Sequence, residues 1–173
     1  MQKHIVSLLC RHTLAIVRNL PPCSTGCRRD RTVQQDTLPS QRCFYRKDVF
    51  CRKKQDVALQ EKRPALILAA KEGRLIYEGA PVCQSFGNEY FYYTSCVMNC
   101  VYNCEYCYLK GMYPSGHIVS FVNLEDIFAE LEEILQKHPV YLCVSYDTDL
   151  MALEDLTGFV ESWLGFVRSH DGI

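Results

Sequence analysis

The stretch Cys100-Val-Tyr-Asn-Cys104-Glu-Tyr-Cys107 is the most informative part of this chain. Its cysteines are spaced Cys-x3-Cys-x2-Cys. Iron–sulfur cubanes usually take four cysteine thiolates. A set of three therefore predicts a [4Fe–4S] cluster with one iron open to a substrate or cosubstrate. Three thiolates converge on one cube only if a short loop curls around it, and Asn99 and Asn103 tolerate the left-handed backbone that such a curl often needs.

Other interpretations of these cysteines fit the pattern less well. Zinc could take Cys96 together with the other three, but structural zinc sites usually use two ligand pairs separated by a longer arm. A disulfide framework conflicts with the odd total of eleven cysteines and with the lack of a visible secretory signal. We therefore predict Cys100, Cys104 and Cys107 as the metal ligands, with zinc as the alternative metal.

The residues around the cysteines predict an α/β fold. Aromatic and β-branched residues favour a strand at Glu89–Ser95, which the cysteine loop follows directly. Apolar residues then recur with helical period over Leu124–Leu135, and Asn123 is placed to cap that helix. The apolar run Val140–Ser145 suits a buried parallel strand, and a last helix spans Leu156–Val167. This order is that of two βα units with functional loops at the carboxyl ends of the strands.

Three regions of the chain differ in composition. Residues 1–40 show no sustained periodicity, predict no element and are compatible with disorder. Residues 41–88 form a basic linker with one short strand at Pro64–Ala70, and residues 89–173 hold the two βα units. Lys and Arg outnumber Asp and Glu by fourteen to five in residues 1–63, and the ratio is five to fifteen in residues 64–173. The basic side chains from Arg42 to Lys54 could meet nucleic-acid phosphates, although a solvated surface is the more usual explanation.

The cysteine stretch resembles the cluster motif of radical S-adenosylmethionine enzymes and, among them, of the spore photoproduct lyase family. Cys104-Glu-Tyr-Cys-Tyr-Leu109 is similar to that family's cluster motif, Phe121–Ile127 to the start of its first barrel helix, and Ser145–Asp149 to the exit of its second strand. The resemblance implies an incomplete (βα) partial barrel, preceded here by a basic, poorly defined N-terminal segment. It also implies two cofactors, a [4Fe–4S] cluster and S-adenosyl-L-methionine.

The resemblance further implies roles for residues near the cluster. Tyr106 would pack near the adenine of the cosubstrate. Tyr108 would lie at the reaction centre, with plain core packing as the alternative. Thr148 and Asp149 would contact S-adenosylmethionine, and Asp149 has a helix cap as its alternative. In the family, one electron cleaves a carbon–sulfur bond of the cosubstrate, and the resulting 5′-deoxyadenosyl radical abstracts hydrogen from the substrate.

One position departs from the family pattern. Members that act on the spore thymine dimer carry a cysteine that returns hydrogen to the product radical, and Tyr146 stands at that position. A phenol could donate hydrogen, so Tyr146 is the second candidate catalytic residue. Strand alternation would place Cys143 on the opposite face from Tyr146, which makes Cys143 a poor substitute.

Two functions are compatible with the sequence. One is a radical S-adenosylmethionine enzyme that repairs thymine-dimer DNA or performs a related radical reaction, which implies DNA and an unidentified one-electron donor as partners. The other is a truncated, catalytically inert iron–sulfur or zinc-binding remnant. Two βα units cannot close a barrel, so we expect a fragment or a truncated gene product. No apolar stretch is long enough to span a membrane, and we expect a cytoplasmic protein.

Overall fold

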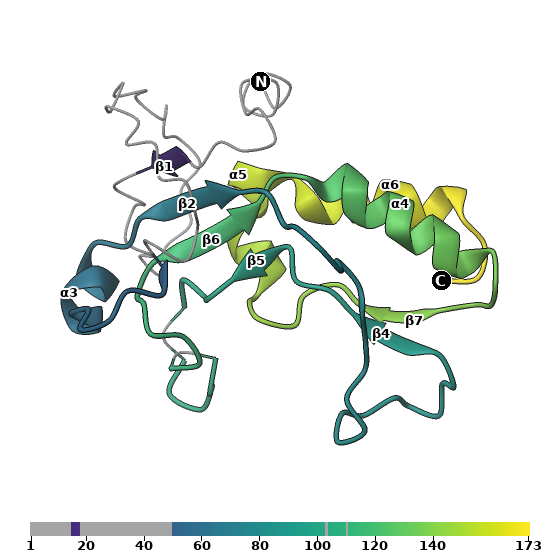
Figure 1. Cartoon of the computed structure of the whole chain (residues 1–173), viewed down its shortest axis with the longest axis horizontal. Helices are drawn as coiled ribbons and strands as arrows, with labels where there is room; N and C mark the ends of the chain where they lie inside the picture. The colour runs from purple at the N-terminus through teal and green to yellow at the C-terminus, as the bar shows by residue number, and fades with distance from the viewer. Residues whose placement is uncertain (1–14, 18–49, 103, 110) are drawn as a thin grey trace.

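The computed structural model describes residues 15–17 and 50–173, apart from residues 103 and 110; of residues 15–17 it describes the backbone alone. The described chain is a mixed α/β structure with two small sheets, and neither sheet closes into a barrel. Figure 1 shows the four-stranded sheet beside helices α4 and α6, with β4 and β7 below those helices in this view. None of the helices in this part of the chain is long and apolar enough to cross a membrane.

The larger sheet has four strands in the order β1 (Ala15–Val17), β2 (Leu66–Ala69), β6 (Ile118–Phe121) and β5 (Val97–Met98). The central strands β2 and β6 run parallel, with Leu66 opposite Ile118, and the two outer strands run antiparallel to them. The strand predicted at Pro64–Ala70 is confirmed as β2. Strand β1 lies where the sequence predicted no element, and the rest of residues 1–40 lies outside the described residues.

The smaller sheet has three strands in the order β3 (Tyr77–Glu78), β4 (Phe91–Tyr93) and β7 (Tyr141–Cys143). Strands β4 and β7 are parallel, with Phe91 opposite Tyr141. Helix α4 (Leu124–Leu135) connects them along the chain, so the predicted parallel pair with a helix between its strands is confirmed. The expectation that β7 is buried is wrong: its three residues are half-buried, as are those of the neighbouring central strand β4, so the whole small sheet is only partly covered.

The path from β4 to α4 differs from the predicted strand, loop and helix. Strand β5 follows β4 at once, the cysteine loop follows β5, and β6 returns the chain to the sheet before α4 begins. All four residues of β6 are buried. Ile118 packs into one apolar cluster, and Val119 and Phe121 pack into another on the opposite face. This two-sided burial removes the apolar–polar alternation that identifies a strand in a sequence.

Asn123 does not cap α4 in the predicted way. It occupies the N-cap position, but its side chain makes no capping hydrogen bond. Instead its Oδ1 accepts from the amide of Lys71 at 2.8 Å, and its Nδ2 donates to the carbonyl of Lys71 and to Asp126 Oδ2, both at 2.9 Å. The side chain therefore ties the start of α4 to the chain just after β2. Tertiary contact has replaced local capping because the parallel strands β2 and β6 end side by side.

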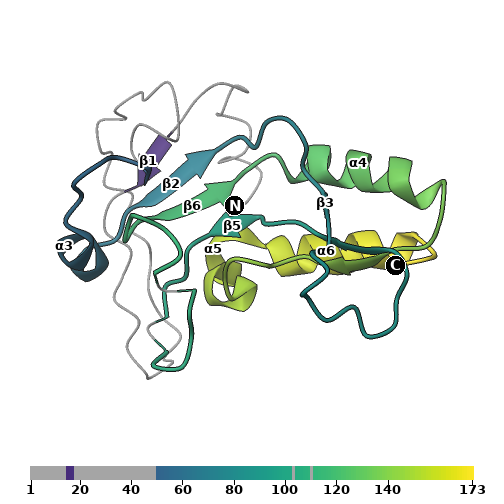
Figure 2. The ribbon, with the colours of Figure 1, turned by 60° about the horizontal axis from the view of Figure 1, so that its bottom comes forward.

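The last predicted helix, Leu156–Val167, falls on two helices, and a 3-10 turn precedes them. A 3-10 turn (Leu150–Leu153) leads into α5 (Glu154–Thr157), and α6 (Phe159–Ser169) follows. The break falls at Gly158, whose φ of 62° is in the left-handed region that ends helices. Figure 2 separates α5 from the long axis of α6. The apolar period continues across the break, so the sequence pattern alone predicted one helix.

Helices α4 and α6 pack through aromatic rings. Phe128 of α4 stacks on Phe166 of α6 with ring centroids 4.4 Å apart, and its edge meets Trp163 at 4.8 Å. Trp163 is 4% exposed and donates from its indole nitrogen to Cys96 Sγ at 3.4 Å. These contacts join both helices to the segment between β4 and β5.

We expect Trp163→Ala to lower the free energy of unfolding by about 3–5 kcal/mol, because it removes a buried indole and leaves a cavity. Urea unfolding followed by circular dichroism measures this change. Leu164→Ala, at the next position of α6 and 52% exposed, is the control and should change stability by less than about 1 kcal/mol. Equal losses in the two variants would contradict this packing.

Candidate functional site

The three predicted metal cysteines lie on one loop, residues 99–117, between β5 and β6. Those strands are antiparallel neighbours, so the loop leaves the sheet and returns to it at the same place. Asn99 closes the base: its side chain donates to the carbonyl of Ser115 at 2.7 Å and to that of His117 at 2.9 Å. The same side chain accepts from the amide of Cys100 at 3.1 Å. One buried amide thus holds both ends of the cysteine loop.

The backbone of Asn99 has the predicted left-handed conformation, with φ of 70°. The matching expectation for Asn103 lies outside the described residues. Helix α3 (Val57–Lys62) holds the returning end of the loop, because Gln60 Oε1 accepts from the amide of Gly116 at 2.9 Å. Gly116 has room for no side chain there, since a Cβ would lie 2.8 Å from the amide nitrogen of Glu61. The loop therefore has a rigid base, which includes Cys100, and Cys104 and Cys107 lie further along it.

The cysteines occupy different depths in this loop. Cys100 is buried beside Asn99, and Cys104 and Cys107 are half-buried. The amide of Cys107 donates to the carbonyl of Cys104 at 3.1 Å, which closes a tight turn between them. Among the described residues, no three His, Cys, Asp or Glu side chains form a group that could hold a metal ion. The assignment of Cys100, Cys104 and Cys107 as ligands stays a prediction.

The chemistry of this donor set nevertheless fits an iron–sulfur cube. Three thiols on eight consecutive residues, with the loop base fixed by Asn99, can supply three of the four ligands that a [4Fe–4S] cluster takes. The turn between Cys104 and Cys107 already brings their backbones together. Binding would need the part of the loop that carries Cys104 and Cys107 to close toward Cys100 at the base.

Cys96 lies in the core, away from this chemistry. It is 0% exposed, and its sulfur accepts from the indole of Trp163 and lies 3.9 Å from the carbonyl oxygen of Val144. Burial raises the pKa of Cys96 to about 11, although the hydrogen bond from Trp163 and the charge of Lys71 act in the opposite direction. Metals bind the thiolate form. Because the Cys96 thiol stays protonated in the core, this environment supports leaving Cys96 out of the predicted metal ligands.

The candidate catalytic residue Tyr146 follows β7 and lies within a group of aromatic rings and one thiol. Its ring packs against Tyr93 at 4.7 Å between centroids, and Tyr93 stacks on Tyr77 at 5.4 Å. Its hydroxyl lies 3.2 Å from the Sγ of Cys83. This hydrogen bond, together with partial burial and the nearby charges of Cys83, Tyr108 and Tyr93, raises the pKa of Tyr146 to about 12. The phenol is therefore protonated throughout the neutral range.

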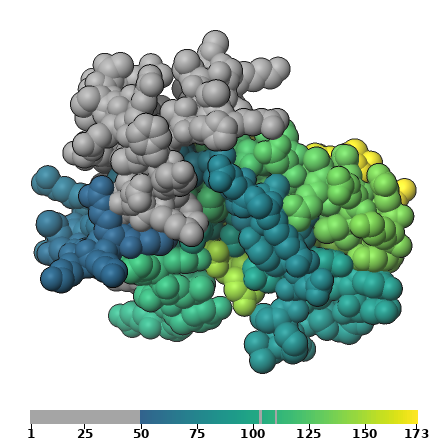
Figure 3. Space-filling model, viewed as in Figure 1, coloured from purple at the N-terminus to yellow at the C-terminus, as the bar shows by residue number. Residues whose placement is uncertain are grey.

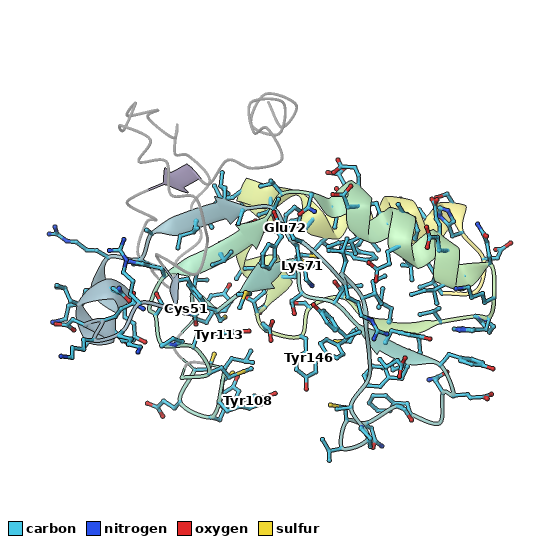
Figure 4. The ribbon with its side chains drawn as sticks, in the orientation of Figure 1. Cys51, Lys71, Glu72, Tyr108, Tyr113 and Tyr146 are labelled. Atoms are coloured by element: carbon cyan, nitrogen blue, oxygen red, sulfur yellow. The ribbon has the colours of Figure 1, made fainter. Side chains whose placement is uncertain are left out.

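The candidate residues on the cysteine loop are exposed. Tyr106 is 93% exposed and Tyr108 is 72% exposed, so core packing, the alternative for Tyr108, is wrong. Tyr108 is near enough to Tyr146 for its charge to affect the pKa of that phenol. Figure 4 shows both Tyr108 and Tyr146 at the lower edge of the molecule in that view. The structure thus brings the two candidate catalytic tyrosines into one neighbourhood.

Thr148 and Asp149 differ sharply in their surroundings. Thr148 is 6% exposed, and its Oγ1 is a buried side-chain oxygen without a hydrogen-bond partner among the described residues. Asp149 is exposed and accepts from the amide of Met151 at 3.0 Å, which caps the 3-10 turn. The helix-cap alternative for Asp149 is confirmed in this form. An unsatisfied buried hydroxyl costs about 1–3 kcal/mol, so Thr148 is the residue here whose environment fits a bound polar ligand.

Sequence reasoning missed two features of this region. Cys83 contacts Tyr146 from the connection between β3 and β4, 63 residues earlier in the chain, and no motif surrounds it. That connection also lines a cavity of about 380 Å³.

The sequence predicted that Cys143 and Tyr146 lie on opposite faces of one strand, and the structure does not support this reasoning. Strand β7 ends at Cys143, so strand alternation does not place Tyr146.

Comparisons with known proteins give one distant likeness. No protein-family model matches the chain, and no curated protein matches it. Among solved structures, the chain is similar to a cysteine-to-serine mutant of spore photoproduct lyase, with a TM-score of 0.49 and 19% sequence identity. The matched part covers 62% of this chain and 31% of that chain. This chain therefore spans about a third of that protein, and an overlap of this kind transfers no residue roles.

We expect Tyr146 to titrate at about pH 12, well above the ordinary value of 10. Carbon-13 NMR of labelled tyrosine, assigned with Tyr146→Phe, measures this pKa. Cys83→Ala should lower it toward 10, because the hydrogen bond to Cys83 is the largest cause of the shift. Since the folded state keeps a proton that the unfolded state loses, Tyr146 stabilises the fold fully below pH 10, and this stabilisation disappears as pH rises to about 12. An unshifted Tyr146 in the wild-type protein would contradict the contact.

Proposed function

We propose that this chain is an iron–sulfur protein of the radical S-adenosylmethionine type, related to spore photoproduct lyase. The observation that carries the proposal is the Asn99-closed loop, which holds Cys100 at its base and carries Cys104 and Cys107 further along. The parallel β4–α4–β7 unit supports the finer proposal that residues 89–173 are the first two βα units of a partial barrel.

Different residues would bind the cluster and the cosubstrate. The three thiolates would hold a [4Fe–4S] cluster and leave one iron for S-adenosyl-L-methionine. Bound together, these groups supply one-electron cleavage of a carbon–sulfur bond, which no side chain can perform. Thr148 Oγ1 would donate a hydrogen bond to the cosubstrate and so become satisfied. Asp149 would accept from its amino group, and the exposed ring of Tyr106 would cover the adenine.

Tyr108 and Tyr146 would act on the substrate side of the site. The phenol of Tyr146 is protonated at neutral pH, as an unperturbed tyrosine would be, and its raised pKa extends this protonation to higher pH, so its hydrogen can be donated. The ring packing against Tyr93 fixes the direction of this phenol. Tyr108, exposed on the cysteine loop, would move with the loop when a cluster binds. We assign these residues as the candidate catalytic groups on that basis.

We include two partners in the proposal, DNA and a one-electron donor. Arg52, Lys53 and Lys54 are all exposed just before α3, and such a basic surface suits DNA phosphates. DNA containing thymine dimers, or another radical substrate, is the class of substrate that the family resemblance implies. An unidentified one-electron donor would reduce the cluster. A cytoplasmic location, where thiols stay reduced, agrees with free cysteines that include exposed Cys51.

A second candidate function is a metal-binding remnant without catalysis. The observation that favours it is that the described cysteines do not converge into a group able to hold a metal ion. In such a remnant the loop would bind a cluster or zinc weakly, and added S-adenosylmethionine would not change the spectrum of the bound metal. Metal content and cosubstrate response therefore separate the two candidates.

Anaerobic reconstitution should yield about four irons and four sulfides per chain, measured by iron and sulfide analysis and by the brown chromophore. Changing Cys100, Cys104 or Cys107 to Ala should abolish the chromophore, because each removes one thiolate of three. Cys96→Ala is the matched control: it should keep the chromophore and lower only the stability of the fold. Stoichiometric zinc without sulfide would favour the remnant.

Thr148→Val should weaken the effect of S-adenosylmethionine on the electron paramagnetic resonance spectrum of the reduced cluster. Without ligands, the same change should leave the free energy of unfolding unchanged or raise it by about 1 kcal/mol, because it removes an unsatisfied hydroxyl. Thr157→Val is the control, since Thr157 Oγ1 already donates to the carbonyl of Leu153 at 3.0 Å. It should lower stability by about 1 kcal/mol and leave the spectrum unaffected. If S-adenosylmethionine does not change the electron paramagnetic resonance spectrum of the wild-type protein, the result would contradict a catalytic role.

A further inference from the structure

The connection between β3 and β4, residues 79–90, forms a compact surface loop with its own internal contacts. The amide of Gly79 donates to the carbonyl of Phe91 at 2.7 Å and closes its ends. Two turns shape the interior, from Cys83 to Ala80 at 2.8 Å and from Asn88 to Ser85 at 3.0 Å. In Figure 3 the teal surface that includes this loop reaches the lower edge of the molecule. Compact loops with nearby ends are frequently functional.

Gly79 shows how closely this loop packs on the strand that follows. A Cβ at Gly79 would lie 1.9 Å from the ring of Phe91, so no larger residue fits unless that ring moves. Phe91 in turn packs against Tyr141 of β7, with ring centroids 5.4 Å apart. The loop is therefore anchored to the smaller sheet at its base, and a cavity of about 380 Å³ lies against it.

The charged side chains that line the cavity are all negative. Its two charged side chains are the carboxylates of Glu78 and Glu89, and no Lys, Arg or His among the described residues lines it. Arg74 pairs with Glu78 at 3.3 Å, but both side chains of that pair are more than half exposed, so water screens the pair. Glu89 makes no ion pair within the part of the chain that the structure describes. A phosphate or carboxylate placed here would meet repulsion, whereas a cation would be attracted.

Aromatic residues complete the lining. Tyr90, Phe91 and Tyr92 lie on the strand side, where Tyr90 stacks on His138 and Phe91 packs against Tyr141, and Ser85 and Asn88 add hydroxyl and amide groups from the loop. Carboxylates recognise organic cations through ion pairing, and hydroxyl and amide oxygens can accept the remaining N–H hydrogen bonds. An inorganic cation would instead need several oxygen ligands converging on one point, and no such group is present among the described residues.

Cys83 links this cavity to the candidate catalytic residues. It lines the cavity, and its Sγ lies 3.2 Å from the hydroxyl of Tyr146. We propose that the cavity binds a small organic cation, with a primary amine or guanidinium group, and that Cys83 is the group through which the occupant contacts Tyr146. This site does not depend on a bound cluster. If the proposed radical chemistry holds, the cavity favours a cationic substrate group over a nucleotide.

The charge preference of the cavity can be measured on Cys83 itself. Iodoacetamide is neutral and iodoacetate is anionic, so the ratio of their alkylation rates at one thiol reports the local potential and cancels the reactivity of that thiol. Cys51 is an internal control, because it is exposed and followed by Arg52, Lys53 and Lys54. Peptide mass spectrometry resolves the two cysteines. We expect the iodoacetamide preference to be larger at Cys83 than at Cys51, because Cys83 shares its cavity with two carboxylates.

Variants and ligands complete the test on the same full-length chain. Glu89→Gln should reduce the iodoacetamide preference at Cys83 and leave that at Cys51 unchanged. Millimolar agmatine, which carries an amine and a guanidinium group, should slow alkylation of Cys83 by iodoacetamide, and thymidine monophosphate should not. Equal preferences at Cys83 and Cys51, no protection by agmatine, or protection by thymidine monophosphate would each overturn the proposal. Loss of iron binding in a separate reconstitution would leave all of these outcomes unaffected and would bear on the cluster alone.

Discussion

The side-chain amide of Asn99 is the interaction on which the cysteine loop depends. It satisfies two carbonyls on the returning strand side and one amide on the departing side, and the left-handed backbone at Asn99 makes this geometry possible. Buried polar groups left unpaired cost about 1–3 kcal/mol each. Replacement of Asn99 would leave several unpaired at once. The rigid base allows the tip to rearrange around a metal without loosening the sheet.

The segment Thr94–Cys96 joins the two sheets into one core. The amide of Thr94 donates to the carbonyl of Cys143 in the smaller sheet, and the carbonyl of Cys96 accepts from Phe121 in the larger one, both at 2.9 Å. Thr94 Oγ1 also donates to the carbonyl of Leu75. Because these residues are buried, both sheets share a single apolar cluster with α4 and α6. The cysteine loop and Tyr146 are thus held on a common frame.

Charge is distributed unevenly over the described residues, and this matters for any substrate. Exposed basic side chains precede α3, whereas the cavity beside Cys83 is lined by Glu78 and Glu89. Between these regions lie the exposed tyrosines of the cysteine loop and the phenol of Tyr146. A polyanion would meet attraction at one end and repulsion at the cavity. A phosphate backbone and a cationic group would therefore use different surfaces of this protein.

Local patterns in the sequence determined the long and periodic elements. The helical period of α4, the apolar run of β2 and the end of the helical pattern before Pro139 all act over a few residues, so they were predictable. The cysteine spacing likewise indicated the metal chemistry, although its ligand set is still to be tested. Tertiary structure alone decided the role of Asn123, the return of the chain through β6, and the contact between Cys83 and Tyr146. Each of these joins residues far apart in sequence, and neither periodicity nor spacing reports a contact that forms only when the sheets pack.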